Sequence, residues 1–526
     1  MRTWAAFGAG AVLLLFSAAM EAADYDLWGY LSFGRLFWSG AGLVAADPFS
    51  YVPTVTLWVH NEWLTGVLFF PLYDHLGGAG LALVRYAAAL AALGFSLAVC
   101  RGRGGQPGWW LFTLAITLVF WASILAPVRA RVFSLVFFCL FAWLLDRTRK
   151  WGWGRTGLVL VPAMALWANL HAGFWLGLVL AGIHVFALAW ERKPLRAPLL
   201  VLAAMAVATL ANPYGPGLWA ATLGNAAAPD PHLEEWLSVW GALHTGLEIF
   251  SMGFVVFVLM SVAALVRDPE RDPRAILILA ATALISALHV RFVVFLAVAV
   301  TLYLPSSLAR AARAGGRSRL PLPVFFVLLV MGAVPLLLLD TQAVQERLAQ
   351  PESYFMNPFT LYAPSVDQAP FEGFYYPTGA VAFIRERGLG DKLLSEYAWG
   401  SWLAWALYPQ CKVGMDGRSQ TVYPPKVREL YWEFARGMEG WRAYLEAWPP
   451  DLVLVRPGSP ADRRMETAPD WRPVYQDRGS VLYQQAAQKR DLRRCASPGK
   501  VSTYKSTPRP SRLARLAAHV FEQPAH

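Results

Sequence analysis

Charged residues are scarce in this chain of 526 residues: Asp, Glu, Lys and Arg make up 15 % of it, whereas 56 % of the residues are hydrophobic. Soluble domains usually contain about 25 % charged residues. A soluble protein of this length would need a charged surface that this composition cannot supply, so a soluble enzyme and a disordered chain are excluded. Only four cysteines are present, which is too few for a disulfide scaffold of this length, and their spacing matches no metal-binding motif. The composition indicates an integral membrane protein.

The sequence motifs of the common nucleotide-dependent and hydrolytic enzymes are absent. The chain has no Walker loop, no dinucleotide-binding glycine fingerprint, no His-Glu-x-x-His helix and no Gly-x-Ser-x-Gly elbow. A nucleotide-driven pump and the common hydrolases are therefore unsupported. The net charge of +11 would suggest nucleic acid for a soluble protein, but membrane proteins concentrate Lys and Arg in inner loops. We expect the lipid bilayer, and no nucleic acid, among its partners.

Long apolar runs predict a polytopic α-helical membrane protein, because a spanning helix needs about 20 mostly apolar residues. The run 63–73 is too short and is followed by polar residues, which indicates an interfacial or re-entrant segment. The first span is either an uncleaved anchor or a signal peptide, and the acidic pair that follows favours the anchor. About eleven spans are predicted: 4–22, 79–99, 108–126, 131–146, 156–170, 173–190, 197–211, 249–266, 275–289, 291–305 and 321–339.

Basic residues fall in alternate connections between these spans. By the positive-inside rule these connections face inward, and the acidic connections, including the loops 24–62 and 212–248, face outward. Eleven crossings also place everything after residue 340 outside. The basic connections contain Arg101, Arg103, Arg147, Arg149, Lys150, Arg155, Arg192, Lys193, Arg196, Arg267, Arg271, Arg274, Arg310, Arg313, Arg317 and Arg319.

The composition changes after the membrane domain, which we assign to residues 1–340. Residues 341–485 have more charge, more Pro and shorter apolar runs, and residues 486–526 are basic and polar, which predicts a disordered tail. Short strands alternating with amphipathic stretches predict a small extracytoplasmic α/β domain with βαβ units in 341–485. The expected strands are 392–397, 412–416 and 451–455, with helices within 399–408 and 425–447.

Acidic and aromatic residues alternate in the first outer loop. Asp26 lies just beyond the end of the first span, ahead of an aromatic helical turn. There a carboxylate is well placed over a membrane-embedded cleft and could act as a general base. The alternative is an interfacial aromatic belt with solvated carboxylates. Asp24, Asp47, His60 and Glu62 are further candidates in this loop.

Several cations lie within spans or at their outer ends, against the orientation rule. Burying a cation near lipid costs several kcal/mol, so such a residue usually has a partner or a function. A lipid phosphate or diphosphate from the outer leaflet would be such a partner, because Arg binds phosphate bidentately. The alternative is snorkelling to headgroups or pairing with acidic residues of the outer loops. The set comprises Arg85, Arg129, Arg131 and Arg291, with His171 and His289.

The second long outer loop, 212–248, offers weaker candidates. Asn212-Pro213-Tyr214-Gly215 is typical of a helix stop followed by a turn, which by itself explains these residues. The acidic pair Glu234 and Glu235 could reach the same cleft from this loop.

The order of these motifs resembles the polytopic GT-C glycosyltransferases, in particular the branch related to protein mannosyltransferases and aminoarabinose transferases. Members often carry Asp-Glu-x-x-Tyr in the first outer loop, where this chain has Asp26-Leu27-Trp28-Gly29-Tyr30, with Leu27 in place of Glu. The resemblance covers residues 1–485. Four further stretches are similar to a bacterial group within this family: Asp47–Tyr51, Asn61–Leu64, Asn169–Phe174 and Asn212–Gly215.

The resemblance implies transfer of a sugar from a polyprenyl-phosphate donor to a glycan, lipid or protein acceptor at the outer face of a bacterial inner membrane. Asp26 would be the catalytic base, assisted by Asp24. A divalent cation such as Mg²⁺ or Mn²⁺ would be held, if at all, by Asp47 and Glu62. The donor phosphate would be bound by cations, a role that the charge argument also favours. The cations are Arg129, Arg131, Arg291, Arg85, His289 and His171, and the acceptor or loop residues are Asp47, His60, Glu62, Tyr214 and Glu235.

Two other classes of function remain open. A transporter or flippase of lipid-linked saccharide could use the same arginines, although the paired halves of many transporters are not evident. A catalytically inactive relative that serves as a scaffold is also compatible with Leu27.

Overall fold

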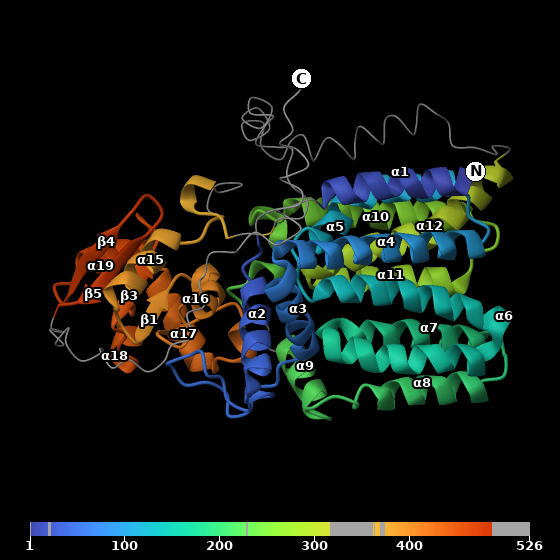
Figure 1. Ribbon diagram of the computed structural model, residues 1–526. Helices are drawn as coiled ribbons and strands as arrows, with labels where there is room; N and C mark the ends of the chain where they lie inside the picture. Colours follow the sequence, from blue (N-terminus) through green and yellow to red (C-terminus); the bar gives the residue numbers. More distant parts are fainter. Residues whose placement is uncertain are drawn as a thin grey trace, which may run out of the picture.

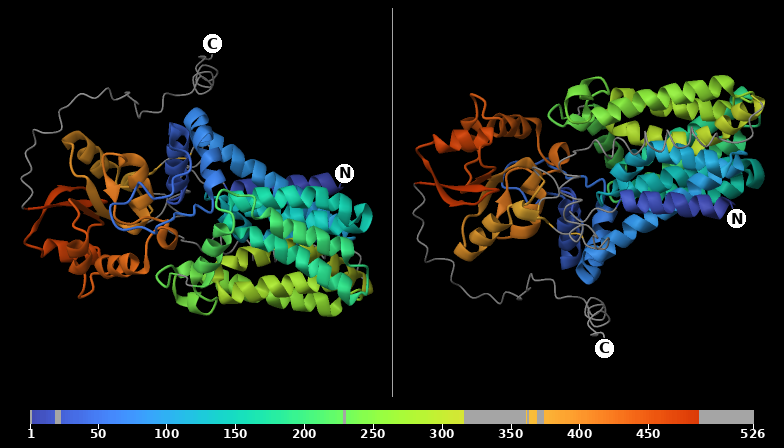
Figure 2. Two further views of the ribbon diagram at one scale, coloured as in Figure 1. Left: turned by 90° about the horizontal axis from the view of Figure 1, so that it is seen from below. Right: turned by 90° about the horizontal axis from the view of Figure 1, so that it is seen from above.

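The computed structural model describes residues 2–18, 23–227, 230–315, 361, 363–368 and 374–486. Helices aligned side by side form a long bundle, and a smaller part that contains a β-sheet lies beyond one end of it (Figure 1). Two further views show the same end-to-end arrangement (Figure 2). The predicted span 321–339 and the tail 486–526, apart from residue 486, lie outside the described residues.

Five helical segments of the bundle are long and apolar enough to cross a membrane, which makes the chain a multi-pass membrane protein. They coincide with the predicted spans 79–99, 108–126, 173–190, 249–266 and 291–305, while the total of eleven crossings stays a prediction. The bundle comprises α1 (Arg2–Ser17), α4 (Gly78–Gly102), α5 (Pro107–Leu125), α6 (Arg131–Leu170), α7 (Trp175–Trp190), α8 (Arg196–Ala208), α10 (Glu248–Arg267), α11 (Pro273–Leu288) and α12 (Val293–Ala314).

The centre of the bundle is α12, which is buried along most of its length and packs against α4, α5, α10 and α11. The helix α10 instead exposes apolar side chains such as Met252, Leu259 and Val266, as expected of a face turned to lipid. The helix α6 changes direction at Gly152, where φ is 75°, a backbone conformation that favours glycine. This break separates the predicted spans 131–146 and 156–170.

The first outer loop is largely helical. It contains α2 (Leu27–Leu36), the π-helical turn η1 (Phe37–Ala41) and α3 (Trp63–Leu76), and α2 and α3 lie across the end of the bundle (Figure 1). The two helices cross so closely at Gly34 and Gly66 that a Cβ atom at Gly34 would lie only 2.2 Å from the carbonyl oxygen of Gly66. Glycine at Gly34 is therefore required for this crossing. The short apolar run 63–73 thus forms a helix at the end of the bundle rather than one aligned with it.

The C-terminal part is built on a five-stranded sheet of order β2-β1-β3-β5-β4, in which β1, β2 and β3 are parallel and β5 is antiparallel to β3 and β4. The first three strands lie where strands were predicted, whereas β4 and β5 were not predicted. The strands are β1 (Lys392–Ser395), β2 (Lys412–Val413), β3 (Leu452–Val455), β4 (Trp471–Gln476) and β5 (Val481–Gln485). The helices are α15 (Thr378–Arg387), α16 (Gly400–Leu407), α17 (Pro425–Ala435), α18 (Arg442–Ala447) and α19 (Pro460–Glu466).

The first outer loop also extends this sheet. The Val413 amide donates to the carbonyl oxygen of Phe49 (2.9 Å), and the Tyr51 amide donates to the Val413 carbonyl (3.2 Å). The Trp28 indole donates to the Tyr376 hydroxyl (2.9 Å) in a shared apolar core. The loop 24–62 is therefore packed with the C-terminal part as well as with the bundle.

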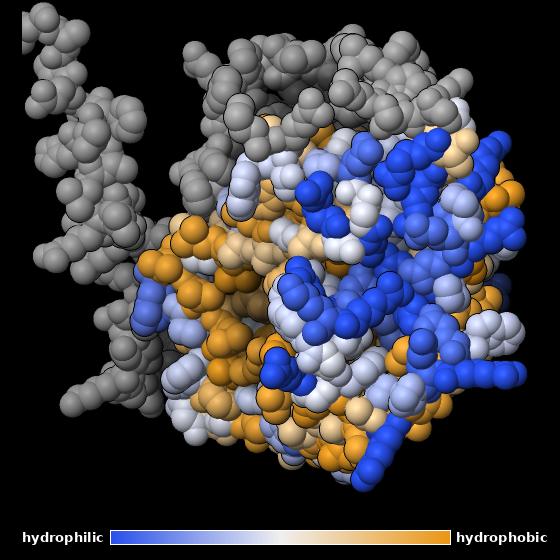
Figure 3. All heavy atoms as spheres, turned by 90° about the vertical axis from the view of Figure 1, so that its right-hand side faces the viewer, coloured by the Kyte–Doolittle hydropathy of each residue, from blue (hydrophilic) through white to orange (hydrophobic). Residues whose placement is uncertain are grey.

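Buried ion pairs cluster at the opposite end of the bundle, where the predicted inner connections gather. Arg310 binds Asp268 through two nitrogen atoms, at 2.6 and 2.8 Å. Arg274 pairs with Glu191 (2.7 Å) at the same end. Hydrophilic residues are gathered over part of this end in the space-filling view (Figure 3). The basic connections that fall within the described residues thus lie at one end of the bundle, as the charge pattern predicts.

Candidate functional site

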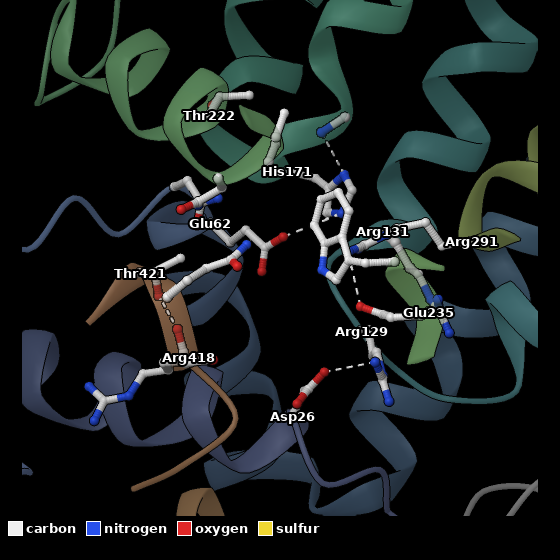
Figure 4. Close-up of a pocket in the computed structure, with 18 of the residues that line it drawn as sticks. Asp26, Glu62, Arg129, Arg131, His171, Thr222, Glu235, Arg291, Arg418 and Thr421 are labelled. Atoms are coloured by element: carbon white, nitrogen blue, oxygen red, sulfur yellow. Dashed lines mark hydrogen bonds and ion pairs between the residues drawn. The ribbon is translucent and has the colours of Figure 1, made fainter. Parts of the chain in front are cut away.

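A cavity of about 690 Å³ lies between the bundle, the first outer loop and the C-terminal part. One part of its wall is apolar, with Leu178 and Val179 from α7, Leu223 from α9 (Gly217–Ala227) and Phe295 from α12. Another part is strongly charged (Figure 4). The charged residues are Asp26, Glu62, Arg129, Arg131, Glu235, Arg291 and Arg418, and His60, His171 and His289 also line the cavity.

Asp26 is held at the N-terminus of α2 by Arg129, which lies in the short link between α5 and α6. The Arg129 Nη1 atom lies 2.7 Å from Asp26 Oδ2, and Arg129 also grips Asp24 through Nε (2.6 Å) and Nη2 (2.7 Å). The side chain of Asp24 is only 8 % exposed, whereas that of Asp26 is 36 % exposed, toward the cavity. Asp24 therefore positions Arg129, and Asp26 is the carboxylate that a ligand can reach.

The environment of Asp26 shifts its pKa toward neutral pH. Burial among the cavity walls raises the pKa of Asp26 to about 6, although Arg129 opposes this shift. The carboxylate is thus ionised at neutral pH and is basic enough to accept a proton from a bound group.

Glu62 forms a second carboxylate centre. The Tyr30 hydroxyl donates to Glu62 Oε2 (2.7 Å), and His171 Nε2 lies 3.3 Å from Oε1. The backbone amide of Gly173 donates to His171 Nδ1 (2.9 Å), so Nδ1 is an acceptor. A neutral imidazole then carries its proton on Nε2, directed toward Glu62.

The protonation of this pair follows from burial. Burial, with Arg291 and Arg131 nearby, lowers the pKa of His171 to about 3. Burial also raises the pKa of Glu62 to about 7, against the hydrogen bond from Tyr30. Glu62 therefore titrates near neutrality, while His171 stays neutral.

Arg131 is an arginine of the cavity wall whose side chain has a buried donor without a partner among the described residues. It begins α6, and its Nη2 atom donates to the Ser123 carbonyl (3.2 Å). Its buried Nε atom has no hydrogen-bond partner among the described residues. Arg291, by contrast, pairs with Glu235 (2.9 Å) and stacks on Trp236. An incoming anion would satisfy Arg131.

His289 and His60 lie at the cavity without an ionic partner in the described residues. His289 Nδ1 is 2.8 Å from the Trp236 carbonyl oxygen. His60 packs between Phe33 and Trp58, and burial lowers its pKa to about 3. His60 therefore shapes the wall rather than supplying a fixed charge, and His289 is oriented by the Trp236 carbonyl.

Four predicted site residues lie outside the cavity lining: Asp24, which is held behind it by Arg129, and three others. Arg85 is buried in α4, where it donates to the Ala126 carbonyl (3.2 Å) and to the Tyr86 hydroxyl (3.2 Å). Tyr214 lies in the turn before α9, and Asp47 is buried against Arg418. The structure does not bring Arg85, Tyr214 or Asp47 into contact with the cavity.

The residues predicted to hold a divalent cation do not fit a shared site. Both carboxylate oxygens of Asp47 are engaged by Arg418, and those of Glu62 by Tyr30 and His171. Within the described part of the chain, no group of three or more His, Cys, Asp or Glu side chains is arranged to bind a metal ion.

The C-terminal part supplies cavity residues that the sequence analysis missed. Ser401 lies in the first turn of α16, which follows β1, and the loop Gly417–Thr421 follows β2. Both segments leave the carboxyl ends of parallel strands, where α/β sheets commonly bind ligands. The predicted strand at 412–416 was the one available signal. Their proximity to Asp26 depends on packing between segments almost 400 residues apart.

Comparisons with known proteins give structural likenesses only, and the one described here is loose. No family model matches the chain, and no curated protein matches it. Fourteen chains of solved structures match. Among them is ArnT from Cupriavidus metallidurans bound to undecaprenyl phosphate, with 15 % sequence identity and a TM-score of 0.48 over 92 % of this chain and 98 % of that chain. At this TM-score the site must be interpreted from its own residues.

Proposed function

We propose that this protein is a membrane glycosyltransferase that moves a sugar from a polyprenyl-phosphate-linked donor to an acceptor at the outer face of the membrane. One observation carries the proposal: a single cavity contains a carboxylate poised near neutrality, Asp26, and an arginine with unused donors, Arg131, beside an apolar wall. Transfer from a lipid phosphate needs these three elements together.

Asp26 accepts the proton of the acceptor hydroxyl. The hydroxyl oxygen then forms a bond to the anomeric carbon of the donor sugar, and the bond between that carbon and the phosphate oxygen breaks. The electron pair of the broken bond stays on the lipid phosphate. Arg129 keeps the Asp26 carboxylate fixed for this step through their 2.7 Å ion pair.

Arg131 stabilises the charge that develops on the departing phosphate. Fixed cations in a site shielded from water are most effective where negative charge forms during the reaction. Arg291 lies in the same wall but shares its charge with Glu235, so Arg131 contributes the larger part. The apolar side chains of α7, α9 and α12 accommodate the first isoprene units.

The orientation rests on charge. The cavity lies between the bundle and the C-terminal part, and the basic connections that the structure describes lie at the far end of the bundle (Figure 1). The positive-inside rule therefore supports a location of the cavity and the C-terminal domain outside the cytoplasm. A bacterial inner membrane is the matching location. Because Asp47 and Glu62 have other partners, no step of this mechanism depends on a divalent cation.

The test is complementation of a deletion strain with the parent chain, Asp26→Asn, Arg131→Gln and the exposed control Glu234→Gln. Mass spectrometry of lipid-linked sugars and surface glycans should show a polyprenyl-phosphate sugar that accumulates in the deletion strain and in both cavity variants. The parent and the control should consume it. If the Asp26→Asn variant consumes the polyprenyl-phosphate sugar normally, Asp26 is not the base, and a transporter or a scaffold is favoured.

A further inference from the structure

We propose that Gly417, supported by Ser401, is a positioning residue for Asp26, so that the C-terminal domain completes the active site instead of merely covering it. This inference rests on the proposed function. It adds a requirement that the membrane domain alone cannot meet.

The backbone at Gly417 lies against the Asp26 carboxylate. A Cβ atom at Gly417 would come within 2.7 Å of Asp26 Oδ1 and 3.3 Å of Ser401 Oγ. Carbon and oxygen atoms in proteins do not pack this closely. Only glycine leaves room for the carboxylate in its present position.

Asp26 could not move aside without loss. Its Oδ2 atom is bound to Arg129 at 2.7 Å, and Arg129 is itself locked by Asp24. The carboxylate is thus enclosed between a guanidinium from the bundle and a backbone segment from the C-terminal domain. A side chain at Gly417 would have to break a charge-assisted hydrogen bond or displace the loop.

The loop that contains Gly417 is itself fixed. The Gly417 amide donates to Ser401 Oγ (3.3 Å). On one side, Arg418 is buried and pairs with Asp416 and with Asp47 of the first outer loop.

On the other side, Asp230 from the second outer loop accepts from Ser419 (2.9 Å) and pairs with Arg428 (3.2 Å). Three segments distant in the chain therefore hold the loop in place. A loop held only to shield the cavity from solvent would not need such a close approach to Asp26.

The consequence is a specific kinetic signature. Gly417 does not touch the donor phosphate, whose candidate ligand is Arg131. Displacing Asp26 should therefore lower kcat and leave the KM for the donor unchanged. Misplacing a catalytic group by about 1 Å can cost about 100-fold in rate.

The experiment uses membrane vesicles that contain the full chain, with the polyprenyl-phosphate sugar fraction of the deletion strain as donor. Gly417→Ala should reduce kcat about 100-fold without a change in donor KM, and should displace the acid limb of the pH profile. Gly224→Ala in α9, where a Cβ atom meets nothing within 4 Å, is the matched control and should behave as the parent. Ser401→Ala, which removes the hydroxyl that accepts from Gly417, should lower kcat by a smaller factor.

The outcomes separate the two proposals. If Asp26→Asn is inactive but Gly417→Ala matches the parent, or raises donor KM at constant kcat, the positioning role is wrong and the glycosyltransferase stands. If Gly417→Ala does not fold, an unchanged kcat in Ser401→Ala overturns the inference. If no donor accumulates in the deletion strain, the proposed function and this inference both fall.

Discussion

At the scale of single residues, one arginine organises the candidate site. Arg129 binds two carboxylates, Asp24 and Asp26, and so acts as a clamp on the base. The neighbouring Arg131 keeps donors unused, although it experiences the same low-dielectric surroundings. In the proposed mechanism, two arginines that the sequence analysis placed in one role are therefore divided between orienting Asp26 and binding the donor phosphate.

The protonation of Asp26 predicts the pH dependence of transfer. The pKa of about 6 for Asp26 means that activity should fall as the pH drops through 6, because the protonated carboxyl cannot accept the acceptor's proton. The negative charge of Glu235 contributes to this raised pKa. Glu235→Gln should therefore lower the pKa of Asp26 and move the acid limb to lower pH. The positive charge of Arg291, no longer paired with Glu235, should shift the pKa of Asp26 in the same direction.

The measurement is kcat/KM against pH in membrane vesicles, with Glu234→Gln as the control. Glu234 is exposed and does not line the cavity, so its replacement should leave the limb in place.

The contribution of Asp26 to folding stability should change with pH in the opposite sense to activity. Because the folded pKa lies above the ordinary value, the fold binds the proton more tightly, and this group's contribution to stability decreases as pH rises from about 4 to about 7.

At the scale of elements, local patterns predicted what depends on local sequence. The helix α4 matches the predicted span 79–99 because a long apolar run is a property of the segment itself. Arg131 stood out because a cation at the outer end of a span breaks the orientation rule, and Asp26 because it lies just beyond the first span, ahead of an aromatic helical turn. Gly417 gave no such signal, since its importance arises only where the loop after β2 meets Asp26 at the N-terminus of α2.

The strands β4 and β5 escaped prediction for a related reason. The strand β4 contains Pro473 and several charged or polar neighbours, which is typical of an exposed edge and weakens the alternating pattern. The strand β5 forms a hairpin with β4 and is also paired with β3, which precedes α19 in the chain. Pairing of this kind cannot be read from one segment.

The coupling between α2 and the C-terminal domain predicts the effect of Tyr376→Phe. The Tyr376 hydroxyl accepts from the Trp28 indole (2.9 Å) and donates to the Ala23 carbonyl (2.7 Å), and all three groups are buried. Removing the hydroxyl leaves a buried donor and a buried acceptor unpaired, each at a cost of about 1–3 kcal/mol. Because Asp26 directly precedes α2, transfer activity should decrease together with thermal stability.

The check is thermal unfolding in detergent alongside the transfer assay, with Tyr375→Phe for comparison. The Tyr375 hydroxyl donates to the Gly479 carbonyl (2.9 Å) within the C-terminal domain, away from α2. That variant should lose some stability but retain activity per folded molecule. Equal activity losses in the two variants would contradict a specific role for the contact with α2.

At the scale of the whole molecule, the two ends of the bundle use buried charge differently. At the cavity end, the buried Nε atom of Arg131 has no partner among the described residues, whereas at the opposite end Arg274 and Arg310 are paired with carboxylates. Arg310 of α12 and Asp268, which follows α10, form a two-point ion pair with Asp268 fully buried. This pair joins the central helix to a peripheral one far from the cavity.

We therefore expect Asp268→Asn to destabilise the protein by about 3–5 kcal/mol, because it leaves Arg310 buried without its counter-charge. Glu270→Gln is the matched control: Glu270 lies 3.5 Å from the same arginine, but its side chain is 68 % exposed, and its loss should change stability by less than about 0.5 kcal/mol. Replacing both members, Asp268→Leu with Arg310→Met, should recover much of the stability, since the uncompensated charge is removed together with its partner. Thermal unfolding in detergent measures all three, and activity per folded molecule should stay at the parent value, because catalysis is confined to the other end. A loss of turnover without a loss of stability would instead mean that the two ends are conformationally linked through α12.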